Sequence, residues 1–458
     1  MKSFNTATIA ALILISGFPL NAAAEQKPPL NPFSETPNSL AETADTAVQD
    51  LAVAANPNNP ACTDFYADRP LFKLNSTRAV DAIPAKSKPA KGSAYAEPTY
   101  GTCVTRATDH AADGVSGFAR NDYSRRQAFN ANNTRQLVSA YDGTWHLYNA
   151  NTHAHVTTLP HLGGDAEPQW HHSDPKILYY LPTNGVGMKL HELNVGSLQT
   201  RQVADFGPRL KALWPDANAA WTKSEGSPSA NGRYWCFMVD NADWQSRGIF
   251  VWDKKTDTIL GHMSTHGNRP DHVSMSPSGK YCVVSGEVTT AYSRDFSTST
   301  QVHTTSEHSD LAFDAAGDDV YVSIDYQSNA GDVFMTRLRD GKRTVLFPTY
   351  IDGTATAIHV SGKAFNKPGW VTIETYANDT SMPRKWLHQK ILAVQLKQNP
   401  IVYNLAFHRS HYAGYWTAPA ASVNRDFTRV IYNSNWDVNS ETDVDSYEID
   451  IPVDALKP

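Results

Sequence analysis

Histidine, arginine and tyrosine side chains stand near the beginning of several short strand-like segments, and together these residue types can move a proton. His146, Arg247 and Tyr292 are three of them. A neutral imidazole accepts a proton near neutral pH, a guanidinium stabilises negative charge, and a phenol carries an exchangeable proton. If the three converge on one cleft, they form a set suited to general acid–base catalysis.

A repeated β-hairpin would have to position these residues. Each copy places a polar turn between two apolar strands, and copies recur roughly every forty to fifty residues. A period of this size, with strands alone between the turns, predicts an all-β chain folded as a β-propeller. The clearest copies are 227–238, 273–284 and 311–322, with fainter ones at 168–180 and 420–432.

Seven units of this kind can be drawn, so we predict a seven-bladed β-propeller. Each unit begins with an inner strand, turns, and returns through strands of alternating character. The segment 99–109 is expected to add a closing strand beside the last blade. The units are 115–160, 165–205, 220–262, 270–303, 307–347, 355–405 and 413–453.

The topology of a propeller sorts polar residues by face. The first strand of a blade starts at one face, the second strand ends there, and the third strand starts there again. Residues at these places should therefore share one functional face. Those before or at first strands are Glu167, Glu225, Asp271, His272, Glu307, His308, His359 and Tyr415, and those at third strands are His146, Arg247 and Tyr292.

The N-terminal residues predict export. Lys2 precedes an apolar stretch at 9–20 that is too short to span a bilayer, and small residues follow it at 22–24. We therefore expect a secreted protein. The predicted regions are a signal peptide at 1–24, a linker or extended arm at 25–60, and a propeller catalytic domain at 61–458.

Charge and aromatic content narrow the classes of partner. The net charge is −6 and no run of basic residues occurs, which argues against nucleic acid. No segment after the first twenty or so residues is long and apolar enough to suggest a membrane partner. The 11 Trp and 20 Tyr residues suit either contact with carbohydrate or packing between blades. We expect a monomer.

Four cysteines leave two pairing questions. Cys62 and Cys103 could staple the N-terminal arm to the closing strand. Cys236 and Cys282 could face each other on adjacent blades or point apart, and the sequence leaves both open.

A divalent metal is one further expectation. Asp271, Cys282 and His308 lie near one rim of the predicted propeller, and carboxylate, thiolate and imidazole are plausible zinc ligands. Carboxylates such as Glu225 and Asp271 could instead hold calcium. The alternative for Cys282 is a buried free thiol. No organic cofactor is expected.

Five segments resemble those of secreted seven-bladed propeller polysaccharide lyases. The resemblance is to the ulvan lyases, with the rhamnose–glucuronate lyases and oligogalacturonate lyases as relatives. The resemblance covers most of the chain after about residue 110. It rests on the segments Glu167-Pro168-Gln169-Trp170-His171, Ser224-Glu225-Gly226-Ser227-Pro228-Ser229, Glu307-His308-Ser309-Asp310-Leu311-Ala312, Ser410-His411-Tyr412-Ala413-Gly414-Tyr415-Trp416 and Asn433-Ser434-Asn435-Trp436.

The resemblance implies β-elimination at a uronic acid of an anionic polysaccharide. Carried over by position, His146 is the catalytic His, Arg247 neutralises the uronate carboxylate, and Tyr292 is the catalytic Tyr. Ulvan lyases place a second His about twenty residues after the first, and this chain has Glu167 in that neighbourhood. Either His171 or His172 takes over that role, or the mechanism depends on Tyr292. His146→Ala should then abolish turnover and leave the fold intact.

Seven further residues are expected to contact the substrate. Local cations among them would attract an anionic polymer to a chain that is acidic overall. They are Glu167, His171, His172, Arg269, His272, Arg409 and Tyr415.

Two other functions fit the same sequence. One is a non-catalytic exported propeller that binds a glycan or a protein. The other is a hydrolase that acts through paired carboxylates, for which Glu167 and Glu225 could serve. Product absorbance separates the three, because only elimination leaves a conjugated double bond.

Overall fold

The computed structural model describes residues 59–377 and 381–457, and strands dominate them. The described residues belong to one compact unit, Val53–Pro458. The expected signal peptide at 1–24 and nearly all of the linker at 25–60 lie outside the described residues. Within the described ranges, no helix is long and apolar enough to cross a membrane.

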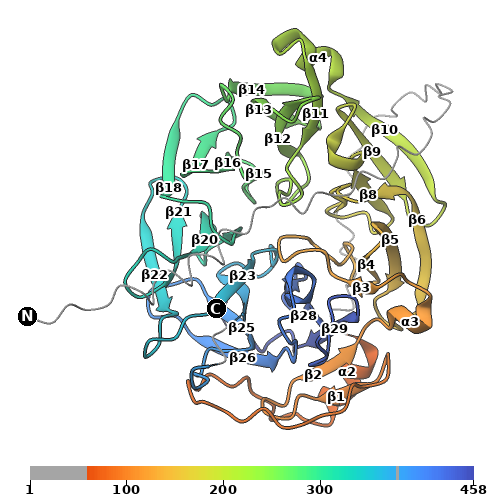
Figure 1. The fold of residues 1–458 in the computed structure, drawn as a ribbon, viewed down its shortest axis with the longest axis vertical. Helices are drawn as coiled ribbons and strands as arrows, with labels where there is room; N and C mark the ends of the chain where they lie inside the picture. Colours follow the sequence, from red (N-terminus) through yellow and green to blue (C-terminus); the bar gives the residue numbers. More distant parts are fainter. Residues whose placement is uncertain (1–58, 378–380, 458) are drawn as a thin grey trace, which may run out of the picture. The chain divides into compact units, whose positions relative to one another are not determined.

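Five sheets of the described chain contain four antiparallel strands each, and consecutive sheets follow one another around a centre (Figure 1). Their strands are β7 (Gln169–Trp170), β8 (Ile177–Tyr180), β9 (Lys189–Asn194) and β10 (Gln199–Asp205); β11 (Ala217–Trp221), β12 (Tyr234–Asn241), β13 (Ser246–Asp253) and β14 (Thr258–Ser264); β15 (His272–Met275), β16 (Tyr281–Ser285), β17 (Thr289–Ser293) and β18 (Ser299–His303); β19 (Ser309–Phe313), β20 (Asp319–Asp325), β21 (Asp332–Arg337) and β22 (Arg343–Pro348); β23 (Ala357–Ser361), β24 (Trp370–Tyr376), β25 (Lys390–Gln395) and β26 (Val402–Phe407).

A sixth sheet has nine strands and joins the two ends of the described chain. Its strands are β1 (Ala94–Ala96), β2 (Cys103–Arg106), β3 (Phe118–Arg120), β4 (Arg135–Ala140), β5 (Thr144–Asn149), β6 (His155–Gly163), β27 (Ser422–Val423), β28 (Arg429–Ser434) and β29 (Val444–Asp450). The helices are α2 (Pro60–Ala67), α3 (His110–Asp113) and α4 (Gly207–Leu213), with 3₁₀ turns at η1 (Thr183–Gly185) and η2 (Tyr415–Thr417).

The all-β propeller predicted from the hairpin repeat is confirmed. The count of seven blades stays a prediction, because β3 pairs in parallel with β29 and so merges the first and last predicted units into one sheet.

The turn between β15 and β16 shows why the repeated hairpins form and how they link neighbours. Gly279 adopts a positive φ of 74°, and a Cβ there would approach the Tyr234 ring of the preceding sheet to 2.4 Å, so the turn requires glycine. The backbone N–H of Ser278 donates to Asp319 of the following sheet at 2.9 Å, and Ser276 Oγ donates to the same carboxylate at 3.0 Å. One polar turn therefore both reverses the chain and connects consecutive sheets.

Aromatic side chains fill the space between sheets. Phe206, which follows β10, packs against Phe250 and Trp252 of the next sheet with ring centroids 5.3 and 5.2 Å apart. All three rings are at most 1% exposed. Many of the aromatic residues counted in the sequence thus stabilise contacts between sheets.

Cys236 of β12 and Cys282 of β16 form a disulfide between neighbouring sheets. This settles the pairing that the sequence left open. It also shows that the prediction of Cys282 as a zinc ligand is wrong, because a sulfur in a disulfide has no thiolate to offer.

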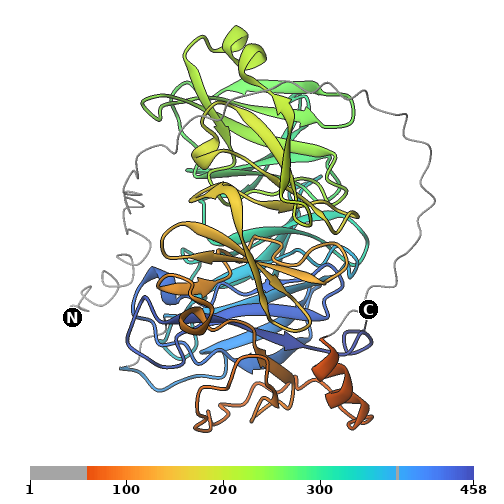
Figure 2. The ribbon, with the colours of Figure 1, turned by 90° about the vertical axis from the view of Figure 1, so that its right-hand side faces the viewer.

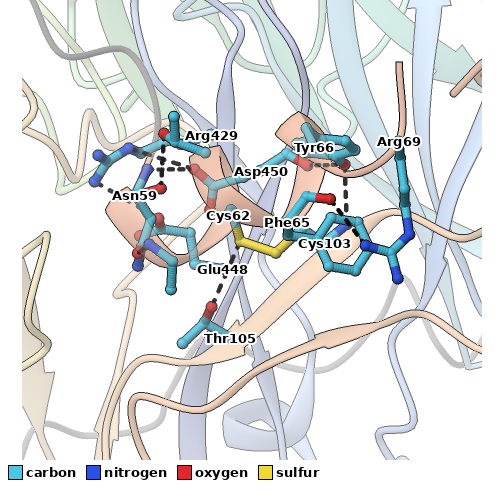
Figure 3. The surroundings of a disulfide bond; sticks show 12 residues. Asn59, Cys62, Phe65, Tyr66, Arg69, Cys103, Thr105, Arg429, Glu448 and Asp450 are labelled. Atoms are coloured by element: carbon cyan, nitrogen blue, oxygen red, sulfur yellow. Dashed lines mark hydrogen bonds and ion pairs between the residues drawn. A yellow bond between two sulfur atoms is a disulfide. The ribbon is translucent and has the colours of Figure 1, made fainter. Parts of the chain in front are cut away.

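The N-terminal part of the described chain closes the propeller (Figure 3). β2 pairs with β29, so the expected closing strand within 99–109 and the Cys62–Cys103 disulfide are both confirmed. The hydroxyl of Tyr66 in α2 donates to the backbone carbonyl of Asp450 at 2.7 Å, and the backbone N–H of Asn59 donates to the Asp450 carboxylate at 2.7 Å. Figures 1 and 2 show α2 at the outer side of this sheet, away from the centre.

Removing the closing disulfide should cost stability and spare the centre of the molecule. The double change Cys62→Ala and Cys103→Ala removes a bond between residues 41 positions apart in the sequence. The unfolded chain then gains entropy, which should lower the free energy of unfolding by about 2–4 kcal/mol. Urea unfolding should show this fall in the free energy of unfolding. An unchanged denaturation midpoint would show that α2 is held by its hydrogen bonds alone.

Candidate active site

A segment between β3 and β4 reaches the inner strands of several sheets; we call Tyr123–Gln127 the central segment, part of the orange loop that enters the centre in Figure 1. The guanidinium of Arg126 donates to the carbonyls of Pro168 (3.3 Å) and Ser224 (2.8 Å). Gln127 Nε2 donates to the carbonyl of Val423 at 3.4 Å, and Val423 lies in β27, near the C-terminal end of the chain. The inner strands therefore hold this segment between them.

Arg125 is the buried cation of the central segment, with 4% of its surface exposed. Its guanidinium forms an ion pair with Glu225 and lies 2.9 Å from His272 Nε2. It also donates to Ser309 Oγ at 3.1 Å. Burial alone would lower the pKa of Arg125, but the Glu225 carboxylate outweighs burial and raises it, so Arg125 stays charged.

His272 lies between Arg125 and an aspartate. Its Nδ1 is 3.3 Å from an Asp271 oxygen, so the tautomer that fits places the proton on Nδ1 and lets Nε2 accept from Arg125. Asp271 also accepts from Lys223 at 3.0 Å and from Ser306 Oγ at 3.0 Å. Burial raises the pKa of Asp271, but the hydrogen bond from His272 and the charge of Lys223 hold it well below its usual range. Both nitrogens of His272 are thus engaged, and this ring is a positioning group.

Two further imidazoles stack beside this network. The rings of His308 and His359 are 4.4 Å apart, and His359 stacks in parallel on Tyr376 at 4.5 Å. His308 Nδ1 donates to the carbonyl of Ile358 at 2.7 Å, which leaves its Nε2 lone pair available, and His359 Nδ1 contacts the carboxyl group of Glu374. Burial lowers the pKa of both His308 and His359 to about 3, so both rings are neutral at neutral pH.

The open side of this cluster carries phenols and a carboxylate. Tyr412 and Tyr415 are 40% and 56% exposed, and the Tyr412 ring lies 5.7 Å from Tyr376. Burial raises the pKa of Tyr412, which keeps its hydroxyl protonated. Burial also raises the pKa of Glu307, next to His308, and makes its carboxylate more basic. The cluster therefore offers proton donors and acceptors around a buried positive charge.

The three predicted catalytic residues do not meet there. His146 on β5 hydrogen-bonds His155 (3.0 Å) and Thr144 (2.9 Å) of its own sheet. Arg247 on β13 pairs with Asp216 at 2.6 Å. The predicted convergence is therefore not found. The topology of a propeller does assign residues at the start of third strands to the predicted face. Third strands, however, lie farther from the axis than first strands.

Tyr292 and Glu167 have local structural roles. The Tyr292 ring packs on Phe296 at 5.7 Å. Glu167 is buried and accepts from the backbone N–H groups of Thr222 (2.9 Å) and Ser224, which fixes the loop that carries Glu225. Burial raises the pKa of Glu167 to about 7.

Four other expected substrate-binding residues also lie outside the cluster. Arg269 pairs with Asp240 at 2.9 Å, and Arg409 donates to the carbonyl of Pro84 at 2.8 Å. His171 and His172 follow the first strand β7, whereas the cluster residues precede or begin their first strands, so the two rings belong to the other face. They lie outside this cluster, and their role in substrate binding stays a prediction. The cluster does contain residues that the sequence analysis placed before or at first strands, namely His272, His308, His359 and Tyr415.

Arg125 lies within the predicted unit 115–160, and the sequence analysis gave it no functional role. A signal existed: Arg125 and Arg126 stand next to each other in the connection between β3 and β4. Two adjacent arginines so close to an axis require carboxylate or carbonyl partners from several blades.

Metal binding can be tested against the donors present. Among the described residues, His110, Asp443 and Asp445 are the one group of three close donors, but Lys88 and Arg106 already neutralise those carboxylates, with contacts of 3.1 and 2.7 Å to Asp445. That group does not suit a cation. His308 fits better, because a neutral imidazole whose Nδ1 is fixed by an outer partner is a typical metal ligand. The Nδ1 of His359 contacts Glu374, and a metal at its Nε2 would replace the Tyr376 hydroxyl, which lies 3.4 Å away.

Comparisons with known proteins support the fold. No protein-family model matches the sequence, and no curated protein matches it significantly. An oligogalacturonate lyase from Vibrio parahaemolyticus matches with a TM-score of 0.56 and 12% identity, over 79% of this chain and 99% of that one. An oligogalacturonate lyase in complex with manganese matches with a TM-score of 0.56 and 14% identity, over 80% and 99%. At these identities the likeness concerns the fold alone, and it lends no support to the narrower ulvan-lyase resemblance.

Proposed function

We propose that the protein is a secreted polysaccharide lyase that cleaves a uronic-acid-containing polymer by β-elimination, with an ulvan-like rhamnose–glucuronate linkage as the preferred substrate. The observation that carries the proposal is the buried Arg125 cation surrounded by neutral imidazoles, phenols and a basic carboxylate at one end of the propeller axis. The shared fold with oligogalacturonate lyases supports it.

The chemistry of elimination matches this set of side chains. Loss of the C5 proton beside a uronate creates an enolate-like dianion, and fixed positive charge stabilises it more than it stabilises the substrate. The cations of the cluster are Arg125 and Lys223, which are paired with Glu225 and Asp271 and would share their charge with a bound uronate.

We assign the proton acceptor and the proton donor from the directions in which burial shifts the pKa of each side chain. An imidazole with a pKa of about 3 is a weak base at neutral pH, which argues against His308 and His359 as the proton acceptor. We assign that role to Glu307, whose carboxylate burial has made more basic, and the protonation of the leaving oxygen to Tyr412. His308 and His359 would hold a divalent cation, which would withdraw charge from the uronate carboxylate when bound.

The test is ultraviolet absorbance of an unsaturated uronate while the purified protein is mixed with ulvan, glucuronan, rhamnose-capped glucuronate glycans or pectin, with and without added Mn²⁺. A rise on one polymer identifies both the reaction and the substrate. A flat trace on every polymer with folded protein would overturn the lyase and favour a binding propeller. New reducing ends without absorbance would indicate hydrolysis.

A further inference from the structure

Exposed aromatic rings gather on one face of the propeller. Within the described ranges, only Tyr141, Tyr412 and Tyr415 among the phenylalanine, tyrosine and tryptophan residues expose 40% or more of their surface. Tyr141 lies in the turn between β4 and β5, and the other two lie in the connection between β26 and β27. In a propeller, the turn after a second strand and the connection that enters a first strand lie at the same face. All three rings therefore share the face of the candidate active site.

Two packed rings join Tyr415 to Tyr141. Trp416 meets Tyr415 edge-on, with ring centroids 4.9 Å apart. Phe118, which is buried, lies 5.2 Å from Trp416 and 5.7 Å from Tyr141. We call Tyr415, Trp416, Phe118 and Tyr141 the aromatic row. It carries an exposed phenol at each end and a partly exposed indole between them.

One end of the aromatic row approaches the candidate active site. Tyr412, which stands just before Tyr415 in the same connection, lies 5.7 Å from the Tyr376 ring. Tyr376 stacks in turn on His359 of the cluster at 4.5 Å. A polymer that occupies the cluster and continues past Tyr412 therefore meets the row.

The backbone holds the exposed rings in place before any ligand arrives. Gly117 has a positive φ of 69°, and a Cβ there would come within 2.6 Å of the Tyr141 side chain, so Tyr141 packs against a glycine backbone. In the connection that carries Tyr415, the hydroxyl of Thr417 donates to the carbonyl of Gly414 at 2.7 Å. Rings fixed in this way lose little conformational freedom when they bind.

A buried arginine joins the row to the central segment. Arg120 is 2% exposed, and its guanidinium lies 5.5 Å from the centroid of the Trp416 ring and 5.6 Å from that of Phe118. Arg120 also donates to the backbone carbonyl of Asp122 at 3.2 Å, and Arg126 of the central segment donates to the Asp122 carboxylate at 2.9 Å. The row and the candidate active site are thus held by one connected set of contacts.

We propose that the aromatic row binds the sugar residues that continue beyond the cleaved linkage of a polysaccharide, with Tyr415 and Tyr141 each contacting a sugar ring. A tyrosine ring suits this ligand, because it offers an apolar face together with a polar hydroxyl. The choice of a polysaccharide rests on the proposed function. Contacts spread along the row make the protein prefer long chains to short ones.

Isothermal titration calorimetry can test the row with a disaccharide and an octasaccharide from each polymer of the absorbance panel. All proteins carry His308→Ala, so that the sugars are not consumed. The octasaccharide should bind more tightly than the disaccharide. Tyr141→Ala should weaken octasaccharide binding about fivefold, the loss expected for one aromatic contact, and leave disaccharide binding within twofold.

Two variants control for effects on the fold. Tyr141→Phe keeps the ring and should bind the octasaccharide within twofold of the parent protein. Tyr403→Ala also removes a tyrosine that packs on a tryptophan, with its ring 5.7 Å from Trp370, but it lies on the outer strand β26 and should bind normally. Tyr415→Ala should weaken octasaccharide binding about fivefold and serves if Tyr141→Ala proves unstable.

Octasaccharide binding that is absent, or that is unchanged in folded Tyr141→Ala and Tyr415→Ala proteins, would overturn the proposal. A wild-type dimer that Tyr141→Ala converts to a monomer in sedimentation would also overturn it, because a second copy would then cover the row. Tyr141-dependent binding without cleavage of any polymer would overturn the proposed lyase and leave the row standing. Cleavage with Tyr141-independent binding would overturn the row alone.

Discussion

His308→Ala is expected to lower lyase turnover by about a hundredfold or more, the range typical of losing one directly acting group. His308 has an Nδ1 fixed by the Ile358 carbonyl and stacks on His359, and Arg125 donates to the backbone carbonyl of the preceding residue, Glu307, at 3.5 Å. The measurement is the initial rate of ultraviolet absorbance on the responsive polymer, with thermal unfolding recorded to show that the fold is kept.

His146→Ala is the control, because it also removes an imidazole ring, here a buried one on β5. It should keep its rate within a few-fold of wild type, since His146 hydrogen-bonds His155 and Thr144 of its own sheet. The opposite pattern, with His146→Ala inactive and His308→Ala active, would restore the assignment that the sequence resemblance implied.

Arg125→Met is expected to lower the free energy of unfolding by about 3–5 kcal/mol, the cost of removing one partner of a buried ion pair. The change leaves the Glu225 carboxylate without its cation and removes the hydrogen bonds that join His272 to Ser309. Urea unfolding monitored by tryptophan fluorescence measures the loss, and lyase activity of the fraction that stays folded should also fall.

Arg247→Met serves as the comparison, since it also replaces a paired arginine. Arg247 and Asp216 are solvent-exposed partners, so their loss should leave the denaturation midpoint nearly unchanged. Equal destabilisation by the two variants would show that the central segment contributes no more than a surface ion pair.

Structural features that depend on residues close in sequence could be predicted, because the local backbone geometry determines them. The turn at Gly279 reverses the chain through a positive φ and creates a hairpin wherever the pattern recurs. The same local pattern predicts which residues stand at the start of first strands, and His272, His308 and His359 are found together for that reason. The pairing of Cys62 with Cys103 was likewise within reach, because the closing strand places them together.

The sequence by itself thus determined the class of fold, the hairpin repeat, the closing strand and the face to which first-strand residues belong. Tertiary structure alone decided which side chains reach the axis: Arg125 and the central segment do, and His146, Arg247 and Tyr292 do not. The reason is that distance from the axis depends on packing between sheets, and Arg125 meets Glu225 and Ser309 across 100 and 184 residues of chain. Strand alternation carries no information about contacts of that separation. The Cys236–Cys282 bond arises from the same packing.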